Sequence, residues 1–148
     1  MLTIRRAVLD SVLDHAYSGL PDISCGLVAG PEGSDRPERH IPMRNAEPSR
    51  TFWAFDPVER WRVRAEMDER GEEPVVIYYS QGLPHARISS ATVAYAVEPQ
   101  VHYLVISASH PETPLFRSFT VVDGRAVEDR ISILEERAVE DEINDSTP

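Results

Sequence analysis

The sequence predicts an α/β fold in which a curved, mixed β-sheet is flanked by helices. Two amphipathic segments, over residues 4–16 and 57–70, have the apolar spacing of helices. Six short apolar or alternating stretches, bounded mostly by Gly, Pro or Asp, have the composition of strands. Their order along the chain is helix, two strands, helix, strand, short helix and three strands. This order is typical of a mixed sheet with helices on its faces.

The composition fits one globular domain and excludes several function classes. The chain has 148 residues, of which 41% are hydrophobic and 27% charged, enough for one folded core. The formal net charge of −10 argues against nucleic acid and anionic membranes, which both need a basic face. No apolar run reaches membrane-spanning length and no signal-like segment follows Met1, so we expect a cytoplasmic protein.

The first predicted helix covers residues 4–16. Apolar residues recur there every four positions, at Ile4, Val8, Val12 and Ala16. Gly19 and Pro21 end it. The apolar residues 24–29 are then expected to form a buried strand. Residues 40–43 contain Pro42, which suits a strand at the edge of the sheet.

The second predicted helix, from Pro57 to about Arg70, has defined ends. Asp56 is a good N-cap, Pro57 suits the first helical position, and Glu59 is placed to close a capping box. Gly71 ends the helix. The residues that we expect to face inward on it are Val58, Trp61 and Ala65.

The remaining elements follow from apolar runs and turns. Residues 75–79 are continuously apolar, as in a strand buried at a sheet centre. Ser89 is expected to cap a short helix that runs to Val97. The last three predicted strands cover residues 101–107, 116–122 and 126–134. The dipeptide Asp123-Gly124 predicts a tight hairpin turn between the last two strands.

One segment carries a recognisable site pattern. It reads Tyr79-Ser80-Gln81-Gly82, then six residues, then Ser89-Ser90-Ala91-Thr92. This frame resembles that of the JAMM (JAB/MPN) metallopeptidase family, whose sites read His-x-His-Pro, six residues, then Ser-x-x-Asp, with a catalytic Glu upstream. Residues 21–27 resemble the family's Glu-x-Cys-Gly strand, and residues 73–80 resemble its metal-site strand.

The resemblance covers roughly residues 1–127. Within the family, the chain is similar in particular to the small bacterial members that trim ubiquitin-like sulfur-carrier proteins. It implies a JAB/MPN, cytidine-deaminase-like architecture over residues 1–134. Residues 135–148 would follow as an acidic tail, with six acidic residues and one Arg, and we expect this tail to be a solvated extension.

In this chain the positions that match the family's chemical groups carry other residues. The two His ligands fall on Tyr79 and Gln81, the Asp ligand on Thr92 and the catalytic Glu on Ile23. A phenol, an amide and a hydroxyl are neutral and far poorer zinc ligands than imidazole and carboxylate. Ile23 cannot accept a proton from water. We therefore expect no metal, no cofactor and no zinc peptidase activity; Ser89 alone keeps the family's residue type.

Three function classes stay open. The first is a catalytically silenced binding or scaffold module for a ubiquitin-like sulfur-carrier protein or an active JAMM paralogue. The second is a repurposed, zinc-independent enzyme or a small-molecule binding protein of a biosynthetic pathway. The third is a zinc enzyme with unrecognised ligands. A homodimer is compatible with each of them. In the first two, the residues expected to line the ligand site are Ile23, Tyr79, Ser80, Gln81 and Thr92.

A metal-free nucleophile is the sharpest enzymatic hypothesis. Cys25 with His85 as its base, and Ser89 as a hydrogen-bond donor to an oxyanion, would supply such a site. The simpler reading of each residue is structural: a lone Cys in an apolar strand is usually a small buried hydrophobe, and Ser89 is explained as a helix cap. The other histidines, at positions 15, 40, 102 and 110, have no ligand spacing, and the aromatic residues at 52, 53, 55, 78 and 79 could line the cleft.

Overall fold

The computed structural model describes residues 1–47, 53–82, 86–95, 100–109 and 112–135. Its helices are α1 (Arg6–Ser18), α2 (Pro57–Arg70) and α3 (Ser90–Tyr95). Its strands are β1 (Leu2–Arg5), β2 (Cys25–Pro31), β3 (Arg39–Met43), β4 (Glu72–Gln81), β5 (His102–Ser107), β6 (Leu115–Val122), β7 (Arg125–Asp129) and β8 (Ile131–Leu134). The acidic tail from residue 136 onward and the predicted end of the short helix at Val97 lie outside the described residues.

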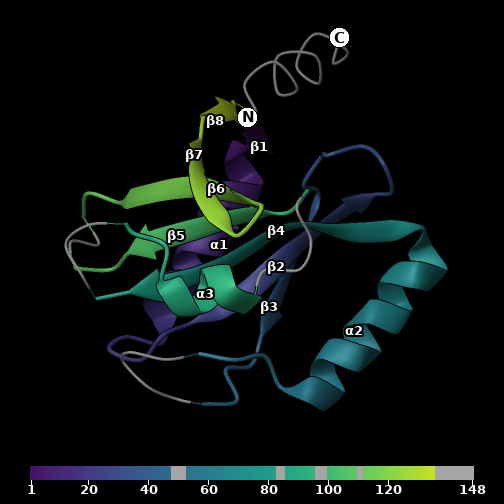
Figure 1. Cartoon of the computed structure of the whole chain (residues 1–148), viewed down its shortest axis with the longest axis horizontal. Coiled ribbons are helices and arrows are strands. Elements are labelled where there is room, and N and C mark those ends of the chain that lie inside the picture. Colours follow the sequence, from purple (N-terminus) through teal and green to yellow (C-terminus); the bar gives the residue numbers. More distant parts are fainter. Residues whose placement is uncertain (48–52, 83–85, 96–99, 110–111, 136–148) are drawn as a thin grey trace, which may run out of the picture.

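A six-stranded mixed sheet forms the centre of the molecule (Figure 1). The strand order is β3-β2-β4-β5-β6-β7, and β4 and β5 run parallel while the other neighbours are antiparallel. The predicted α/β class is therefore confirmed, and so is the edge position of the strand that carries Pro42. The hairpin turn between β6 and β7 is also confirmed, since Asp123 and Gly124 both have positive φ.

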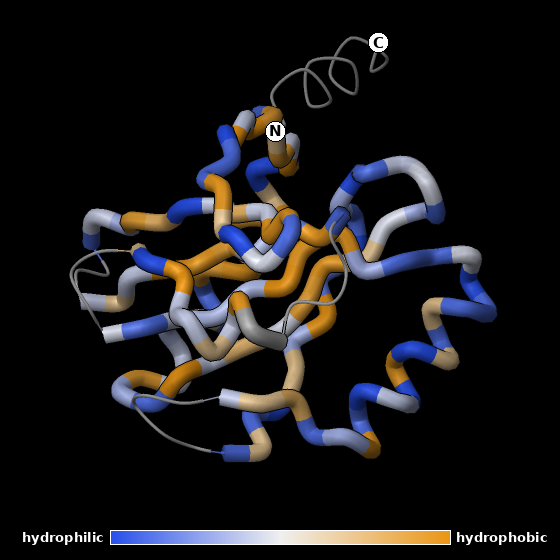
Figure 2. The backbone as a smooth tube through the Cα atoms, viewed as in Figure 1, coloured by the Kyte–Doolittle hydropathy of each residue, from blue (hydrophilic) through white to orange (hydrophobic). Residues whose placement is uncertain are grey.

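The two faces of the sheet are covered by different elements. Helix α1 lies on one face, where its residues Leu9, Val12 and Ala16 pack with Val28 and Tyr78. Helix α3 lies on the opposite face (Figure 1). Figure 2 shows that the central strands are strongly hydrophobic, as expected for strands covered on both faces. Among the described residues, no helix is both long and apolar enough to cross a membrane.

The two ends of the described chain pair in a second, two-stranded sheet. Strand β1 runs parallel to β8, with Leu2 opposite Ile131. The sequence predicted a helix from Ile4, but Leu2 and Ile4 are buried in alternation with more exposed neighbours, as in a strand, and α1 starts at Arg6. The predicted strand over 126–134 is likewise two strands in different sheets, which separate at Arg130.

Helix α2 has the predicted N-cap at Asp56 and the predicted end at Gly71, but a different buried side. The Asp56 carboxylate accepts hydrogen bonds from the amides of Val58 and Glu59, and Gly71 ends the helix with φ of 67°. The expected inward face is wrong, since Val58, Trp61 and Ala65 are exposed.

The buried side of α2 is formed instead by Val63 and Met67, which pack against Leu27 of β2. The Glu59 carboxylate lies on this side and accepts a 2.7 Å hydrogen bond from the backbone amide of Arg44. These contacts with β2 and with the segment before α2 determine which side of the helix is buried. The apolar spacing within α2 did not identify that side.

Replacing Gly26 by Ala should destabilise the fold, because Tyr78 of the neighbouring strand lies directly over this glycine. A Cβ atom at position 26 would lie 2.4 Å from the phenol oxygen of Tyr78. We expect a loss of about 2 kcal/mol or more in unfolding free energy, measured by urea denaturation. Gly82→Ala is the matched control, since a Cβ there would meet no atom of the described residues within 4 Å. Equal stability of the two variants would contradict the close packing at Gly26.

Candidate functional site

Tyr79 lies near the end of β4, on the face of the sheet that α3 covers. Its side chain is 2% exposed, and its ring stacks on Trp53 with a centroid distance of 5.2 Å and an interplanar angle of 27°. Its phenol oxygen accepts a 3.0 Å hydrogen bond from the backbone amide of Ser89. Tyr79 is therefore bound to both chain segments that flank it on this face, the one before α2 and the one before α3.

Gln81 closes a ring of hydrogen bonds with the backbone. Its amide nitrogen donates to the carbonyl of Arg87 at 2.8 Å, and its amide oxygen accepts from the N–H of the same residue at 3.0 Å. Both ends of the amide are thereby used inside the chain. The pair of bonds holds the segment that follows β4 against the end of that strand.

Ser89 and Thr92 form the start of α3. The Ser89 hydroxyl oxygen accepts a hydrogen bond of 3.2 Å from the amide of Thr92 and lies 2.7 Å from the Thr92 hydroxyl. This is the geometry of an N-cap, so the predicted capping role of Ser89 is confirmed. Thr92 is buried, and its hydroxyl is paired with Ser89.

Ile23 and Cys25 lie beneath Tyr79 in an apolar cluster. Cys25 is fully buried and stands opposite Tyr79 in the β2–β4 register. Burial, and after it the charge of Glu59, raises the pKa of the Cys25 thiol to about 12. The buried members of the cluster are Ile23, Cys25, Tyr79, Ala86, Val101, Tyr103, Val105, Phe119 and Val121. A thiolate nucleophile is strongly disfavoured in these surroundings.

The proposed base for that thiol, His85, lies outside the described residues, so the Cys25 and His85 pair stays a prediction. Ser80, the next residue of β4 after Tyr79, uses its hydroxyl within the chain. Its Oγ accepts from the amide of Ser24 at 2.9 Å, and its own amide donates to the Ser24 carbonyl at the same distance. Ser80 thus fixes the start of β2 beside β4.

These residues do not fit a zinc ion. Tyr79, Gln81 and Thr92 are neutral, and their polar atoms already bond to the chain itself. In the part of the chain that the structure describes, no group of three His, Cys, Asp or Glu side chains is arranged to hold a metal. The side chain of Tyr79 connects the segment before α2 with the segment before α3, and an apolar cluster lies beneath it.

A small groove lies beside this site, between α2 and the sheet. Its volume is about 190 Å³, below the roughly 300 Å³ at which pockets for drug-sized ligands begin. The side chains that line it are Leu27, Phe55, Arg60, Arg64, Met67, Pro74 and Ile77. Phe55 and Ile77 also pack against the cluster beneath Tyr79, so the groove adjoins the site.

Tyr78 and two histidines lie on the other face of the sheet, away from Tyr79. Tyr78 was one of the aromatic residues that could line the cleft, but it is a core residue on the α1 side, because consecutive strand residues point to opposite faces. There it contacts His15 and His40. Sequence spacing missed this group because its members come from three elements far apart in the chain. Phe52 lies outside the described residues.

Comparison with known proteins gives a consistent picture. The profile of the family described as prokaryotic homologs of the JAB domain matches residues 5–122. The chain is 43% identical over 136 residues to the CysO-cysteine peptidases of Mycobacterium tuberculosis and Mycobacterium bovis, covering 92% of this chain and 93% of those proteins.

Solved structures are also similar. A protein of Desulfitobacterium hafniense has a TM-score of 0.79 at 29% identity, with 92% of this chain and 94% of that chain covered. A JAB1/MPN domain protein of Archaeoglobus fulgidus has a TM-score of 0.60 at 15% identity, with 90% and 99% covered. The second likeness concerns the fold alone.

Proposed function

Because this chain belongs to the prokaryotic JAB-domain family, we propose that it is a catalytically silent member that binds a ubiquitin-like sulfur-carrier protein. Its relatedness to CysO-cysteine peptidases supports a link to sulfur-carrier proteins. The fold is retained, whereas the positions of the family's zinc ligands and catalytic Glu carry Tyr79, Gln81, Thr92 and Ile23. Selection for binding without hydrolysis leaves this combination.

The observation that carries the proposal is the internal use of the substituted side chains. Tyr79 holds the amide of Ser89, Gln81 holds both backbone groups of Arg87, and Thr92 pairs with Ser89. In place of a metal, these hydrogen bonds fix the segment between β4 and α3. We infer that this edge of the sheet binds a partner without cleaving it. The residues that determine the structure of the edge are Ile23, Tyr79, Ser80, Gln81 and Thr92.

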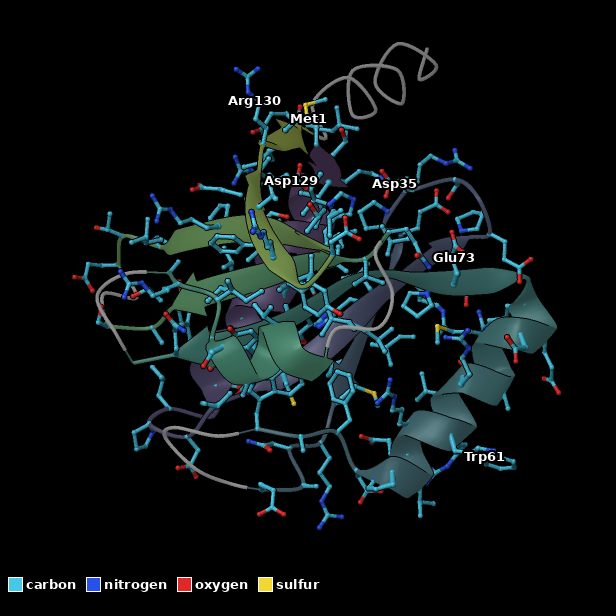
Figure 3. The ribbon with its side chains drawn as sticks, in the orientation of Figure 1. Met1, Asp35, Trp61, Glu73, Asp129 and Arg130 are labelled. Atoms are coloured by element: carbon cyan, nitrogen blue, oxygen red, sulfur yellow. The ribbon has the colours of Figure 1, made fainter. Side chains whose placement is uncertain are left out.

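Helix α2 supplies the surface that best suits the carrier. Val58 is 68% exposed and Trp61 is 76% exposed, and Figure 3 shows Trp61 on the outer side of α2. Exposed apolar side chains grouped on one element mark interaction sites, and Trp and Arg are enriched among residues that dominate binding energy. Arg62 is exposed on the same side of α2 as Val58, and its guanidinium suits an acidic face on the carrier.

Trp61→Ala should weaken binding to the carrier by at least about tenfold, because a large exposed aromatic would lose its contact area. The measurement is isothermal titration of the sulfur-carrier proteins of the source organism into the whole chain. Val127→Ala on β7 is the matched control, since Val127 is also exposed but lies on another element. Absence of binding at high micromolar concentration would contradict the proposal itself, whereas equal binding by Trp61→Ala would contradict only the surface.

Catalytic silence is tested separately. A carrier with a C-terminal extension is incubated with the protein and Zn²⁺, and its intact mass is followed by mass spectrometry, with the mycobacterial relative as a comparison enzyme. We expect the carrier mass to stay unchanged with this chain. Release of the extension at a rate that falls in Gln81→Ala would show that the site hydrolyses its partner.

A further inference from the structure

Three side chains with metal-ligating atoms converge on the sheet face covered by α1. His15 comes from α1, His40 from β3 and Tyr78 from β4. The phenol oxygen of Tyr78 lies 2.5 Å from Nδ1 of His15 and 2.5 Å from Nε2 of His40. Two imidazole nitrogens therefore both contact one phenol oxygen, and the three side chains come from three different elements.

The three rings lie at similar distances from one another. Their centroids are 5.9 Å apart for His15 and His40, 5.8 Å for His15 and Tyr78, and 5.4 Å for His40 and Tyr78. In a tetrahedral site with bonds of about 2.0 Å, neighbouring ligand atoms lie about 3.3 Å apart. Each imidazole nitrogen would have to move less than about 1 Å further from the phenol oxygen to admit an ion.

Burial favours the neutral form of each of the three groups. Burial lowers the pKa of His15, and burial together with the charge of His15 lowers the pKa of His40 to about 4. Both imidazoles are therefore neutral at pH 7, the form that binds metals. Burial raises the pKa of the Tyr78 phenol, so its phenolate forms only beside a positive charge.

The surroundings supply orientation and access. The Ser11 hydroxyl lies 2.7 Å from Nδ1 of His40, the ring nitrogen that faces away from Tyr78. With Nε2 bound to a metal, Nδ1 would carry the proton and donate to the Ser11 oxygen, as metal-bound histidines do to their outer partners. His15 and His40 are partly exposed, so an ion can approach the group from solvent.

We propose that His15, His40 and Tyr78 form a binding site for a divalent first-row transition-metal ion. The ion accepts lone pairs from Nδ1 of His15, Nε2 of His40 and the Tyr78 oxygen. The phenol O–H bond breaks as the metal–oxygen bond forms, and its proton passes to solvent. The imidazole that donated to the phenol carries its proton on the other ring nitrogen instead. This site departs from the expectation of no metal, and it is independent of the proposed function, because it lies on the sheet face opposite Tyr79.

Titration with Cu²⁺ alone tests the site, because imidazole suits copper and copper binds most tightly in the divalent series. We expect one equivalent by calorimetry at pH 7.5, together with a visible phenolate-to-copper charge-transfer band. Tyr78→Phe should lose the band and bind at least about tenfold more weakly, as should His15→Ala and His40→Ala, and Ser11→Ala should bind about tenfold more weakly.

Tyr17→Phe is the matched control, because Tyr17 is a neighbouring α1 residue whose phenol oxygen is buried without a hydrogen-bond partner in the described structure. It should keep the band and the affinity. Circular dichroism confirms folding of each variant, and the band in the unmodified protein is read independently of any variant. The proposal is overturned if the protein binds no Cu²⁺, if it binds Cu²⁺ without the band, or if Tyr78→Phe binds equally well.

Discussion

Tyr79→Ala should reduce the free energy of unfolding by about 3 kcal/mol or more, because it leaves a large cavity in a packed region. The ring is 2% exposed, stacks on Trp53 and belongs to the apolar cluster with Cys25. Urea denaturation followed by far-ultraviolet circular dichroism measures this loss, with the slope of the transition compared between variants.

Tyr79→Phe separates packing from hydrogen bonding. It keeps the ring and removes only the acceptor for the Ser89 amide, so we expect a loss of about 1 kcal/mol. If Tyr79→Ala were to cost less than the Phe variant, Tyr79 would be lining an open cleft and not a packed interior. That result would restore a ligand-binding role for its side chain.

Acid should destabilise the protein through Asp129. This carboxylate is 8% exposed, lies 2.5 Å from Nδ1 of His102 and 2.7 Å from the Met1 amino group, and is near Met1 in Figure 3. Burial opposes its ionisation, but hydrogen bonds with the Met1 amine and His102 outweigh burial and hold the pKa of Asp129 below its ordinary value. Since the folded pKa is the lower one, this stabilisation is present above the unfolded pKa of about 3.9 and is lost as pH falls through the folded value.

Asp129→Asn should therefore cost about 3 kcal/mol at neutral pH and flatten the dependence of unfolding free energy on pH below about 4. Denaturant titrations at a series of pH values measure both effects. Asp35→Asn is the matched control: Asp35 lies 2.8 Å from the other nitrogen of His102, but its carboxylate is 59% exposed, so its loss should cost about 1 kcal/mol or less. An Asp35 variant as damaging as the Asp129 variant would contradict the role given to burial.

Local patterns predicted much of the fold, because most elements carry their own end signals. The Asp56 cap, the Gly71 end and the Asp123-Gly124 turn each act within a few residues, so the sequence around them is sufficient. The predicted inward face of α2 was wrong because the helix packs through Val63 and Met67 against Leu27, a contact between elements far apart in the chain. Strand β1 was missed for the same reason, since its partner is β8 at the other end of the described chain.

The candidate site was only partly predictable. The frame from Tyr79 to Thr92 and the cap at Ser89 could be inferred from spacing. Spacing could not reveal that the amide of Gln81 would bond both backbone groups of Arg87, because that depends on the path of the loop. The group of His15, His40 and Tyr78 was equally hidden, since only the packing of α1 and β3 against β4 brings them together.

The pairing of β1 with β8 has a consequence for how the chain folds. Leu2 and Ile131 are joined across almost the whole described sequence, so closing this contact costs more chain entropy than any hairpin in the central sheet. Contacts of such long sequence separation tend to form late, after local ones. We expect hydrogen exchange during refolding to protect the amides of β4 and β5 before those of β1. A chain cut before Ile131 would leave Leu2 and Ile4 without their strand partner and expose them to water.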